Sequence, residues 1–527
     1  MEYKDLVNEI GEIWKSTLNL NEIMPSQSFF ECGGDSLLAV RFLSKCAESN
    51  IPISAKQLYT AISLEDLINM IYKNIGQEGK SEDMVSVLEK GLRHQLLPTQ
   101  ERWVDGSIID INHFNLGGLF YAPKGVTISI LKKAIEIVLS RQEALRTSYK
   151  KSGNEWIAKV LPVDTAKVLM VAKHSSYDDR LEDIEKECTE AQQSMDLEKG
   201  IVFKMMYFPF ERSIGRILII GHHLTLDGFS INVLADEIEK AIKVVMSAEE
   251  LNETPPLQPY HYSKAVEKWV KSKEAQEDAR KWLSLPWDSI TSIKPEKQGK
   301  GLLTSIKTLK NSFSSEETKL LASLADTYKI RLSELLLGAA AFAISKWSNQ
   351  KVQGIDVYYH GRDESPNNID ISKTIAFILN TYPILLDYQE FTQSNWVEHI
   401  AKQIQSLPMN KYSFDALKYY DSSVKDKFFN VPKNKIRYNF RGHMKRIIQR
   451  EECLLKPAPD VELFGRNRSP YQTEKYFLML EGDIVEGSLS FGIKYSTDLF
   501  NEETIQSLIN ETMRLLIDVV KPKELVE

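Results

Sequence analysis

The sequence predicts a small helical domain followed by a larger α/β domain that is built from two lobes. Three observations lead to this fold class. At 527 residues the chain is too long for a single hydrophobic core. Helical periodicity without a strand pattern runs through the first 75 residues. From about residue 92 onward, helical and strand-like segments alternate without any repeat.

The small domain is predicted at residues 1–76 as a helical bundle. The apolar side chains that share one face of its first helix are Leu6, Ile10, Ile13 and Trp14. A second helix is expected to begin at Ser36, directly after a glycine-containing turn. A third is expected around residues 63–75, with Ser63 as its N-cap. The charged, glycine-containing residues 77–91 then predict a linker between two domains.

The large domain is predicted at residues 92–527. Its main helical segments are 126–146, 229–246, 315–329 and 331–347, and its strand-like segments are 215–223, 351–361 and 487–496. Because about 435 residues is large for one core, we expect an N-lobe at about residues 92–285 and a C-lobe at about 286–527. Proline and glycine interrupt the periodicity near residues 286–301, where the join is expected.

Composition excludes several classes of function. The formal net charge is −7 and no basic cluster occurs, which argues against a nucleic-acid partner. The four cysteines are widely separated and lack metal-ligand spacing, so we expect a reducing cytoplasm and no bound metal. No apolar run reaches membrane-spanning length and the N-terminus is too acidic for a secretion signal, so a cytoplasmic protein without a membrane partner is expected.

A short motif, Gly33-Gly34-Asp35-Ser36-Leu37, marks the start of the second predicted helix. A serine at a helix N-terminus is exposed, and the free amides and the helix dipole there stabilise a phosphodiester. The glycines let another enzyme approach the hydroxyl closely. The plainer alternative is that Ser36 only caps the helix. The motif, its preceding pair of phenylalanines and the helical context resemble the attachment site of peptidyl carrier domains, which are four-helix bundles. This resemblance implies a covalent 4'-phosphopantetheine on Ser36, flanked by Asp35 and Leu37.

A second motif follows the apolar strand at residues 216–220. It begins with His222 and His223 and ends with Asp227 and Gly228. Adjacent side chains of a strand point to opposite faces, so one histidine can face a channel while its neighbour is structural. A single histidine on an apolar strand is more often a core residue. Two adjacent histidines followed by Asp-Gly four and five positions later are far less likely to occur by chance. His223 is the predicted general base, since imidazole titrates near neutral pH.

This second motif resembles the HHxxxDG motif of condensation, epimerization and related acyltransferase domains. These have a two-lobed α/β fold of the chloramphenicol acetyltransferase type. The resemblance implies that Asp227 forms a buried ion pair with Arg362, that Gly228 leaves room for substrate, and that a tunnel between the lobes meets His223. Residues 96–103 and 141–147 resemble two further family motifs, and Arg146 in the latter is expected to maintain the fold.

The sequence signals are mixed as to which reaction the large domain catalyses. The first lobe, including Ile231, resembles condensation domains. The segments 358–363 and 436–442, the latter with Asn439, resemble epimerization domains. Tyr358, however, occupies the position of their catalytic glutamate, and tyrosine is a poor base at neutral pH. Condensation is therefore preferred; the alternatives are L-to-D epimerization of the tethered group and a non-catalytic platform that recruits a tailoring enzyme.

The resemblance to nonribosomal peptide synthetases also implies partners. An upstream adenylation domain would load the carrier. A phosphopantetheinyl transferase would modify Ser36. A downstream carrier or synthetase module would present the acceptor amine.

Overall fold

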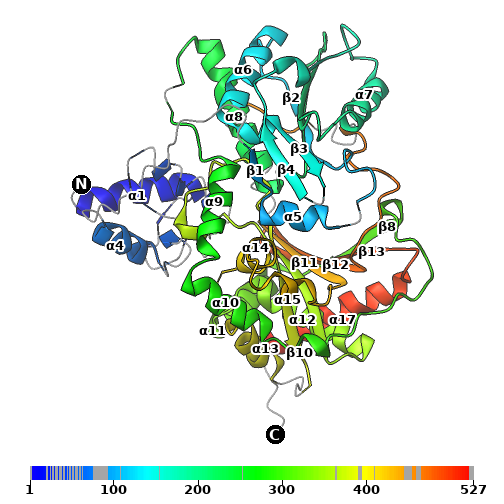
Figure 1. The fold of residues 1–527 in the computed structure, drawn as a ribbon. Coiled ribbons are helices and arrows are strands. Elements are labelled where there is room, and N and C mark those ends of the chain that lie inside the picture. Colours follow the sequence, from blue (N-terminus) through cyan, green and yellow to red (C-terminus); the bar gives the residue numbers. More distant parts are fainter. Residues whose placement is uncertain are drawn as a thin grey trace.

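The computed structural model describes residues 93–520 with short gaps, together with part of the first 74 residues (Figure 1). Within 93–520 the gaps are residues 107, 154, 252, 363–364, 390–394, 409, 444–453 and 459–463. In the N-terminal part the described residues are 3–18, 20, 22–23, 25, 29, 32, 34, 38–39, 42–43, 45–46, 49, 51, 53, 57–58, 61 and 63–74. The predicted linker at 77–91 therefore lies outside the described residues.

The N-terminal domain contains helices α1 (Tyr3–Leu18) and α4 (Leu64–Asn74). The predicted apolar face of α1 is buried in a core of its own, where the ring of Trp14 lies 5.0 Å from that of Phe29 and 5.5 Å from that of Phe42. Ser63 caps α4, since its Oγ accepts a hydrogen bond of 3.0 Å from the amide of Asp66. The four-helix count stays a prediction, because residues 19–63 are described only in part.

The N-lobe, which we define as the part containing α5 to α8 and β1 to β7, has two sheets. One has the strand order β2-β7-β6-β5 and the other the order β1-β4-β3. Its strands are β1 (Arg93–Gln95), β2 (Asn115–Tyr121), β3 (Thr147–Ser152), β4 (Glu155–Val160), β5 (Leu169–Val171), β6 (Phe203–Phe208) and β7 (Arg216–His222). Its helices are α5 (Pro98–Val104), α6 (Ile128–Arg141), α7 (Leu181–Gln193) and α8 (Gly228–Ser247), with the 3-10 turns η1 (Glu143–Arg146) and η2 (Thr165–Lys167).

Strand β7 carries the histidine motif at its end and is buried along its whole length. Its side chains alternate between two apolar clusters, as strand geometry requires. Ile217 and Ile219 pack with α6 and α8, whereas Leu218 and Ile220 pack with α7. The strand is therefore covered on both faces, and its end is held firmly where the histidine motif begins.

The C-lobe, which we define as the part built on the six-stranded sheet, has the strand order β10-β9-β11-β12-β13-β8. Its strands are β8 (Ile306–Ser312), β9 (Val352–Tyr359), β10 (Asn380–Asp387), β11 (Ile436–His443), β12 (Leu478–Val485) and β13 (Ser488–Ser496). Its helices are α9 (Pro259–Trp269), α10 (Lys273–Leu283), α11 (Ser315–Thr327), α12 (Leu332–Ser348), α13 (Trp396–Gln405), α14 (Ser413–Tyr420), α15 (Lys425–Phe429) and α17 (Glu502–Val520), with η3 (Trp287–Ser289), η4 (Leu303–Ser305) and η5 (Pro366–Asn368).

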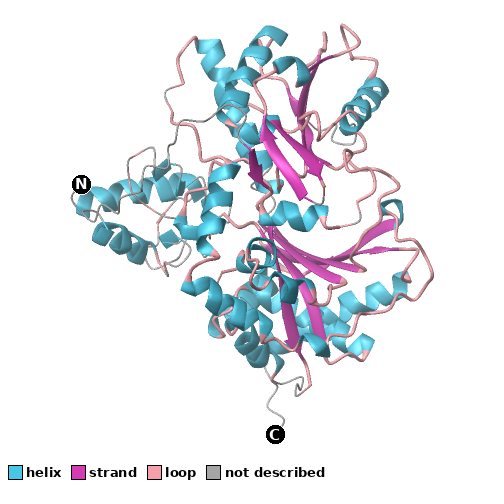
Figure 2. Cartoon of the chain, viewed as in Figure 1, coloured by secondary structure: helices cyan, strands magenta, loops and turns pink. Residues whose placement is uncertain are grey.

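The two faces of this sheet differ in chemistry. One face packs on apolar helices such as α12, and the side chains of Ile355 and Val357 of β9 lie on this face. The alternate residues, Asp356 and Tyr358, point to the opposite face, which also carries charged side chains of β11 and β12. Figure 2 shows the sheets of the two lobes lying one above the other, with helices around each of them.

The packing of α9 and α10 favours a join between the lobes that lies closer to the end of α8 than to residue 286. Tyr262 and Trp269 of α9 and Trp282 of α10 belong to the apolar core of the C-lobe. Both helices precede the predicted join, whose proline and glycine residues instead mark a surface connection after α10. The exact domain and lobe limits remain predictions.

Helix α5 connects the two lobes through a partly buried arginine. The Arg102 guanidinium lies 2.6 Å from Asp356 on the polar face of the C-lobe sheet and 2.9 Å from Asp415 on α14. Burial by itself lowers the pKa of Arg102, but Asp415 and Asp356 reverse that effect and raise it well above its usual value. The pairing therefore joins an N-lobe helix to two elements of the C-lobe.

Replacing Arg102 with methionine is expected to destabilise the large domain strongly. The change leaves Asp356 and Asp415 buried without their cation, which costs about 3–5 kcal/mol of the free energy of unfolding. Urea denaturation followed by tryptophan fluorescence measures it. The matched control is Lys402→Gln, which breaks an exposed ion pair of 2.7 Å with Glu398 and should leave the midpoint of urea denaturation nearly unchanged, because solvent screens such pairs. Equal effects of the two variants would contradict a role for Arg102 in joining the lobes.

Candidate active site

The first histidine of the motif, His222, uses both ring nitrogens within the protein. The amide of Leu224 donates to its Nδ1 at 3.0 Å, so Nε2 carries the proton and donates to the carbonyl of Ile111 at 2.8 Å. Burial lowers the pKa of His222 to about 3, which keeps the ring neutral. His222 is thus fully occupied in holding the loop after β7.

His223 is placed differently, although it is the next residue. Its Nδ1 is buried and meets no hydrogen-bond partner in the described part of the chain. Its ring packs 4.8 Å from that of Phe377 and 5.5 Å from that of Phe114. Burial, and after it the positive charge of Arg468, lower the pKa of His223 to about 4. Hydrogen bonds to the backbone of His223 itself and of Leu226 oppose this lowering, and the imidazole is neutral at pH 7.

Helix α5 supports the histidine loop from one side. The side chain of Gln100 donates to the carbonyl of Leu224 at 2.7 Å and to the hydroxyl of Tyr149 at 3.2 Å. The ring of Trp103 lies edge-on to His222 at 5.7 Å. The motif at residues 96–103 thus holds the histidine loop, while Arg102 of the same helix pairs with the C-lobe.

Asp227 and Arg362 form a buried ion pair between the lobes. One nitrogen of Arg362, Nη2, lies 3.1 Å from each carboxylate oxygen of Asp227. Asp227 also caps α8, accepting a hydrogen bond of 2.8 Å from the amide of Ser230, and it accepts one of 3.0 Å from the amide of Ile378. The structure therefore brings together the two residues for which the resemblance implied an ion pair.

Gly228 lies at the exposed first position of α8. A Cβ atom placed there would meet no atom within 4 Å, so there is open space beside the end of the motif. Gly361, next to Arg362, has a φ of +67°, and a Cβ there would come within 2.4 Å of Asn380 Nδ2. Glycine is needed at 361 for the turn that delivers Arg362 to Asp227.

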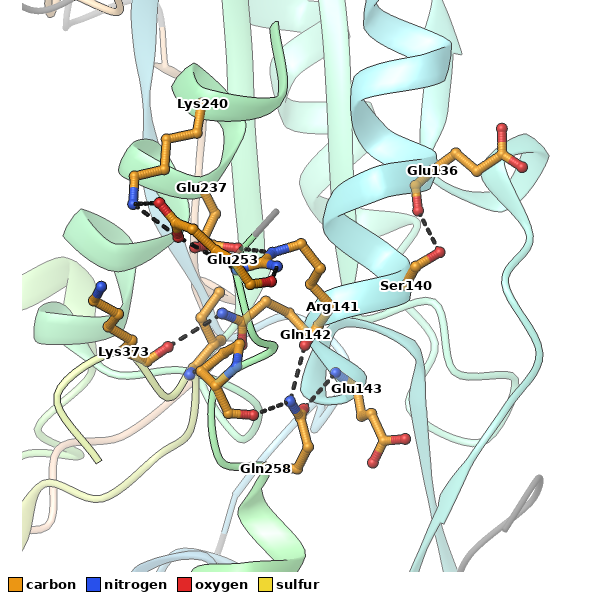
Figure 3. Close-up of polar contacts among 12 residues, drawn as sticks. Glu136, Ser140, Arg141, Gln142, Glu143, Glu237, Lys240, Glu253, Gln258 and Lys373 are labelled. Atoms are coloured by element: carbon orange, nitrogen blue, oxygen red, sulfur yellow. Dashed lines mark hydrogen bonds and ion pairs between the residues drawn. The ribbon is translucent and has the colours of Figure 1, made fainter. Parts of the chain in front are cut away.

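The motif at residues 141–147 forms a polar junction at the end of α6, shown in Figure 3. Arg141 pairs with Glu237 of α8 at 3.0 Å. Gln142 donates to the carbonyl of Lys373 at 3.1 Å, in a C-lobe segment that crosses to the N-lobe. Arg146 donates to the carbonyls of Leu139 and Leu161 within the N-lobe. Each contact joins elements of the fold; the structural role of Arg146 stays a prediction.

Tyr358 and Asn439 lie side by side on the polar face of the C-lobe sheet, in register on the parallel strands β9 and β11. The guanidinium of Arg437 lies 5.0 Å from the centre of the Tyr358 ring. Burial raises the pKa of the Tyr358 hydroxyl, partly offset by Arg437. At neutral pH Tyr358 is therefore protonated, so it can donate a hydrogen bond or a proton but cannot act as a base.

Sequence reasoning missed Arg468, which lies on a C-lobe segment that crosses to the N-lobe. Arg468 pairs with Phe114 as an isolated β-bridge, and its guanidinium lies 4.3 Å from the centre of the Phe114 ring. Its charge acts on both His223 and Tyr358. Neither hydrophobic periodicity nor a sequence motif indicates Arg468, because its pairing with Phe114 joins segments more than 350 residues apart in the sequence.

The predicted attachment residues Ser36, Asp35 and Leu37 lie outside the described residues. In the part of the chain that is described, no group of three or more His, Cys, Asp or Glu side chains is arranged to hold a metal ion. No helix in that part is long and apolar enough to cross a membrane.

Comparison with known families gives two matches. Residues 94–525 match the profile of the family described as Condensation domain. Residues 8–71 match the profile described as Phosphopantetheine attachment site.

Comparison with curated proteins gives distant but nearly full-length matches to this chain. A linear gramicidin synthase protein of Brevibacillus parabrevis is 26% identical over 515 residues, which cover 95% of this chain and 6% of that protein. Gramicidin S synthase 1 of Brevibacillus brevis is 23% identical, and the match covers 99% of this chain and 48% of that protein. The chain thus spans less than half the length of either relative.

Solved structures share the fold of the large domain. The epimerization domain from the third module of tyrocidine synthetase B superposes with a TM-score of 0.69 at 19% identity, covering 82% of this chain and 98% of that one. The X-domain from teicoplanin biosynthesis gives a TM-score of 0.59 at 15% identity, covering 82% and 96%. The first condensation domain of the CDA synthetase gives 0.53 at 12% identity, covering 82% and 97%.

Replacing Asp227 with asparagine is expected to lower the free energy of unfolding by about 3–5 kcal/mol, because Arg362 then remains buried without an anion. Urea denaturation checks this. The double variant Asp227→Asn with Arg362→Met should be more stable than the single variant, since it removes the unpaired charge. Glu136→Gln, on the exposed face of α6, is the control and should change stability by about 0.5 kcal/mol or less. A double variant no more stable than Asp227→Asn would contradict the energetic importance of the pair.

Proposed function

Because the chain belongs to the condensation-domain family and carries a phosphopantetheine attachment domain ahead of it, we propose that it is a carrier–condensation didomain of a nonribosomal peptide synthetase. Ser36 would hold the acyl or peptidyl donor, and His223 would catalyse amide bond formation with an acceptor amine. The observation that carries the proposal is the division of labour between two adjacent histidines. His222 has both nitrogens bonded within the protein, whereas the ring of His223 is neutral and makes no hydrogen bond to another side chain of the described residues.

The surroundings of His223 suit the arrival of a slender arm. Open space lies beside Gly228, at the end of the histidine motif. When bound, 4'-phosphopantetheine supplies the thioester through which an acyl group is presented. The residues that would line its approach are Gly228 and the aromatic neighbours of His223, Phe114 and Phe377.

The residues of the chain would divide the work of amide formation. Neutral His223 orients the acceptor amine and takes its proton as the nitrogen attacks the thioester carbon. Asp227 and Arg362 hold the motif in place without touching the reacting atoms. Much of the acceleration would come from positioning two tethered reactants, which replaces a bimolecular encounter by an intramolecular one.

The proposal implies partners that lie outside this chain. An upstream adenylation domain would load the carrier, a phosphopantetheinyl transferase would modify Ser36, and a downstream carrier or synthetase module would bring the amine. The synthetases that resemble this chain are far longer than it, which supports neighbouring modules of this kind.

Epimerization is the second candidate. Deprotonation and reprotonation of an α-carbon from opposite faces need two groups, and Tyr358 occupies the place of the usual glutamate. Tyr358 could serve as the acid, and the carboxylate of Glu474 acts electrostatically on both Tyr358 and Arg468. A platform that recruits another protein is the third candidate; one solved relative in this fold is an X-domain in complex with OxyB.

The decisive experiment charges the chain at Ser36 with an L-aminoacyl or dipeptidyl pantetheine in heavy water. We expect no deuterium at the α-carbon, and transfer of the acyl group when a carrier-bound amine is added. His223→Ala should abolish transfer while Ser36 loading, followed by intact mass, stays complete. Ser36→Ala should abolish loading itself. Deuterium uptake that requires His223 would show an epimerase, and neither uptake nor transfer would favour the platform.

The pH dependence of catalysis should reflect the low pKa of His223. A base works only when unprotonated, so its contribution falls as the pH drops through the pKa of the folded protein, which is about 4. Single-turnover transfer with a weakly basic acceptor amine should therefore show no inflection near about 6.5, the usual pKa of histidine. An inflection near that pH that is lost in His223→Ala would contradict a buried, neutral base.

A further inference from the structure

Arg468 lies across the β2 strand from the histidine motif. Its bridge with Phe114 places the two residues directly opposite each other in antiparallel pairing, flanked by hydrogen bonds of 2.8 Å from the Asn115 amide to the Asn467 carbonyl and 3.1 Å from the Ser469 amide to the His113 carbonyl. On the other side, the His223 amide donates to the carbonyl of Phe114 at 2.8 Å. Residues opposite one another in such pairs project to the same face, so Arg468, Phe114 and His223 form one row.

The row is held together by ring contacts. The Arg468 guanidinium carbon lies 4.3 Å from the centre of the Phe114 ring, and that centre lies 5.5 Å from the centre of the His223 ring. Packing against an aromatic ring restricts the motion of the guanidinium. The N–H groups of a guanidinium lie in the plane of that group, so they can still donate hydrogen bonds from its edge. The Arg468 guanidinium and the His223 ring therefore both pack against Phe114.

The Arg468 guanidinium is not in contact with a carboxylate of the described residues, although the more distant Glu474 offsets part of the lowering of its pKa by burial. In the described part of the chain its side chain makes no hydrogen bond and no ion pair; the charged and titratable groups that act on it are Glu474, Arg437, Tyr358 and His223. Three other arginines, Arg102, Arg362 and Arg441, each lie within ion-pair distance of a carboxylate. A partly buried guanidinium without such a partner costs stability, since burial disfavours its charged form.

We propose that Arg468 is a further catalytic residue, whose guanidinium binds the thioester carbonyl oxygen as negative charge develops on it. This inference rests on the proposed function but holds for either of its reactions. Attack by an amine on the thioester carbon, and removal of the α-proton, both place negative charge on the same oxygen. A fixed donor aimed at that oxygen stabilises the transition state without reorganising.

Acyl transfer from sulfur to nitrogen needs no reactant other than the thioester and the amine. In amide formation the amine nitrogen bonds to the thioester carbon, and its proton passes to His223. The carbon–sulfur bond then breaks, its electron pair leaves on sulfur, and His223 returns the proton to that thiolate. Arg468 keeps its protons throughout and only donates hydrogen bonds. The same positive charge also disfavours protonation of His223 and of the approaching amine.

The test compares Arg468→Gln, Arg468→Lys and a matched control, Arg466→Gln, in the full chain loaded at Ser36. Arg466 is exposed and lies on the same crossing segment, two residues away. Single-turnover rates of acyl transfer and of α-deuterium exchange are measured from pH 4 to 8, with loading checked by intact mass and folding by thermal unfolding. We expect Arg468→Gln to slow the reaction by about 100- to 1,000-fold. It should also move the acid limb of the pH profile to higher pH. Arg468→Lys should recover part of the rate, and Arg466→Gln should match the unaltered chain.

The outcomes of this experiment distinguish the role of Arg468 from the proposed function of the chain. A folded Arg468→Gln variant that reacts within about threefold of the unaltered chain, while His223→Ala is inactive, overturns the role of Arg468 and leaves the proposed function standing. A slower Arg468→Gln variant with an unmoved acid limb and no rescue by lysine assigns Arg468 a structural role, which also overturns the inference. If the unaltered chain neither transfers nor exchanges, the proposed function fails, and this inference fails with it.

Discussion

The buried ion pair between Asp227 and Arg362 is the contact on which the arrangement of the site depends. Asp227 ends the histidine motif and begins α8, so its position sets both the direction of that helix and the loop that carries His223. Arg362 arrives from the end of β9 in the other lobe and also donates to the carbonyl of Ala376. One contact therefore fixes the histidine loop, the crossing segment around residue 376 and the relation between the lobes. An unpaired charge at either position would be costly, so alternative arrangements of these elements are disfavoured.

The sequence predicted those features that depend on local pattern. The buried face of α1, the N-cap at Ser63 and the fully buried strand before His222 all follow from periodicity and capping, which a short segment carries by itself. The resemblance of the motifs also implied the pairing of Asp227 with Arg362, and family comparison confirmed both domain types. The attachment serine remains a prediction, because Ser36 lies outside the described residues.

Features that depend on contacts between distant segments could not be read in this way. The pairing of Phe114 with Arg468, and the insertion of Arg102 between two C-lobe carboxylates, join residues that no local pattern relates. Tyr358 and Asn439 were each singled out by motif, but their register on neighbouring strands required the sheet order. The join between the lobes was expected where proline and glycine interrupt periodicity, whereas the core shows α9 and α10 packing with the C-lobe, because a break in pattern marks a loop and not necessarily a boundary.

The candidate site is assembled from both lobes, so the environment of its side chains depends on the contacts between the lobes. His223 belongs to the N-lobe, whereas Arg468 acts on it from a C-lobe segment. The low pKa of His223 results from burial and from a cation that the other lobe delivers, so separating the lobes would hydrate the ring, remove the cation and raise that pKa. The environment that lowers the pKa of His223 thus depends on the contacts that hold the lobes together. The two interlobe ion pairs, at Arg362 and at Arg102, therefore help to set the environment of His223 as well as the relation between the lobes.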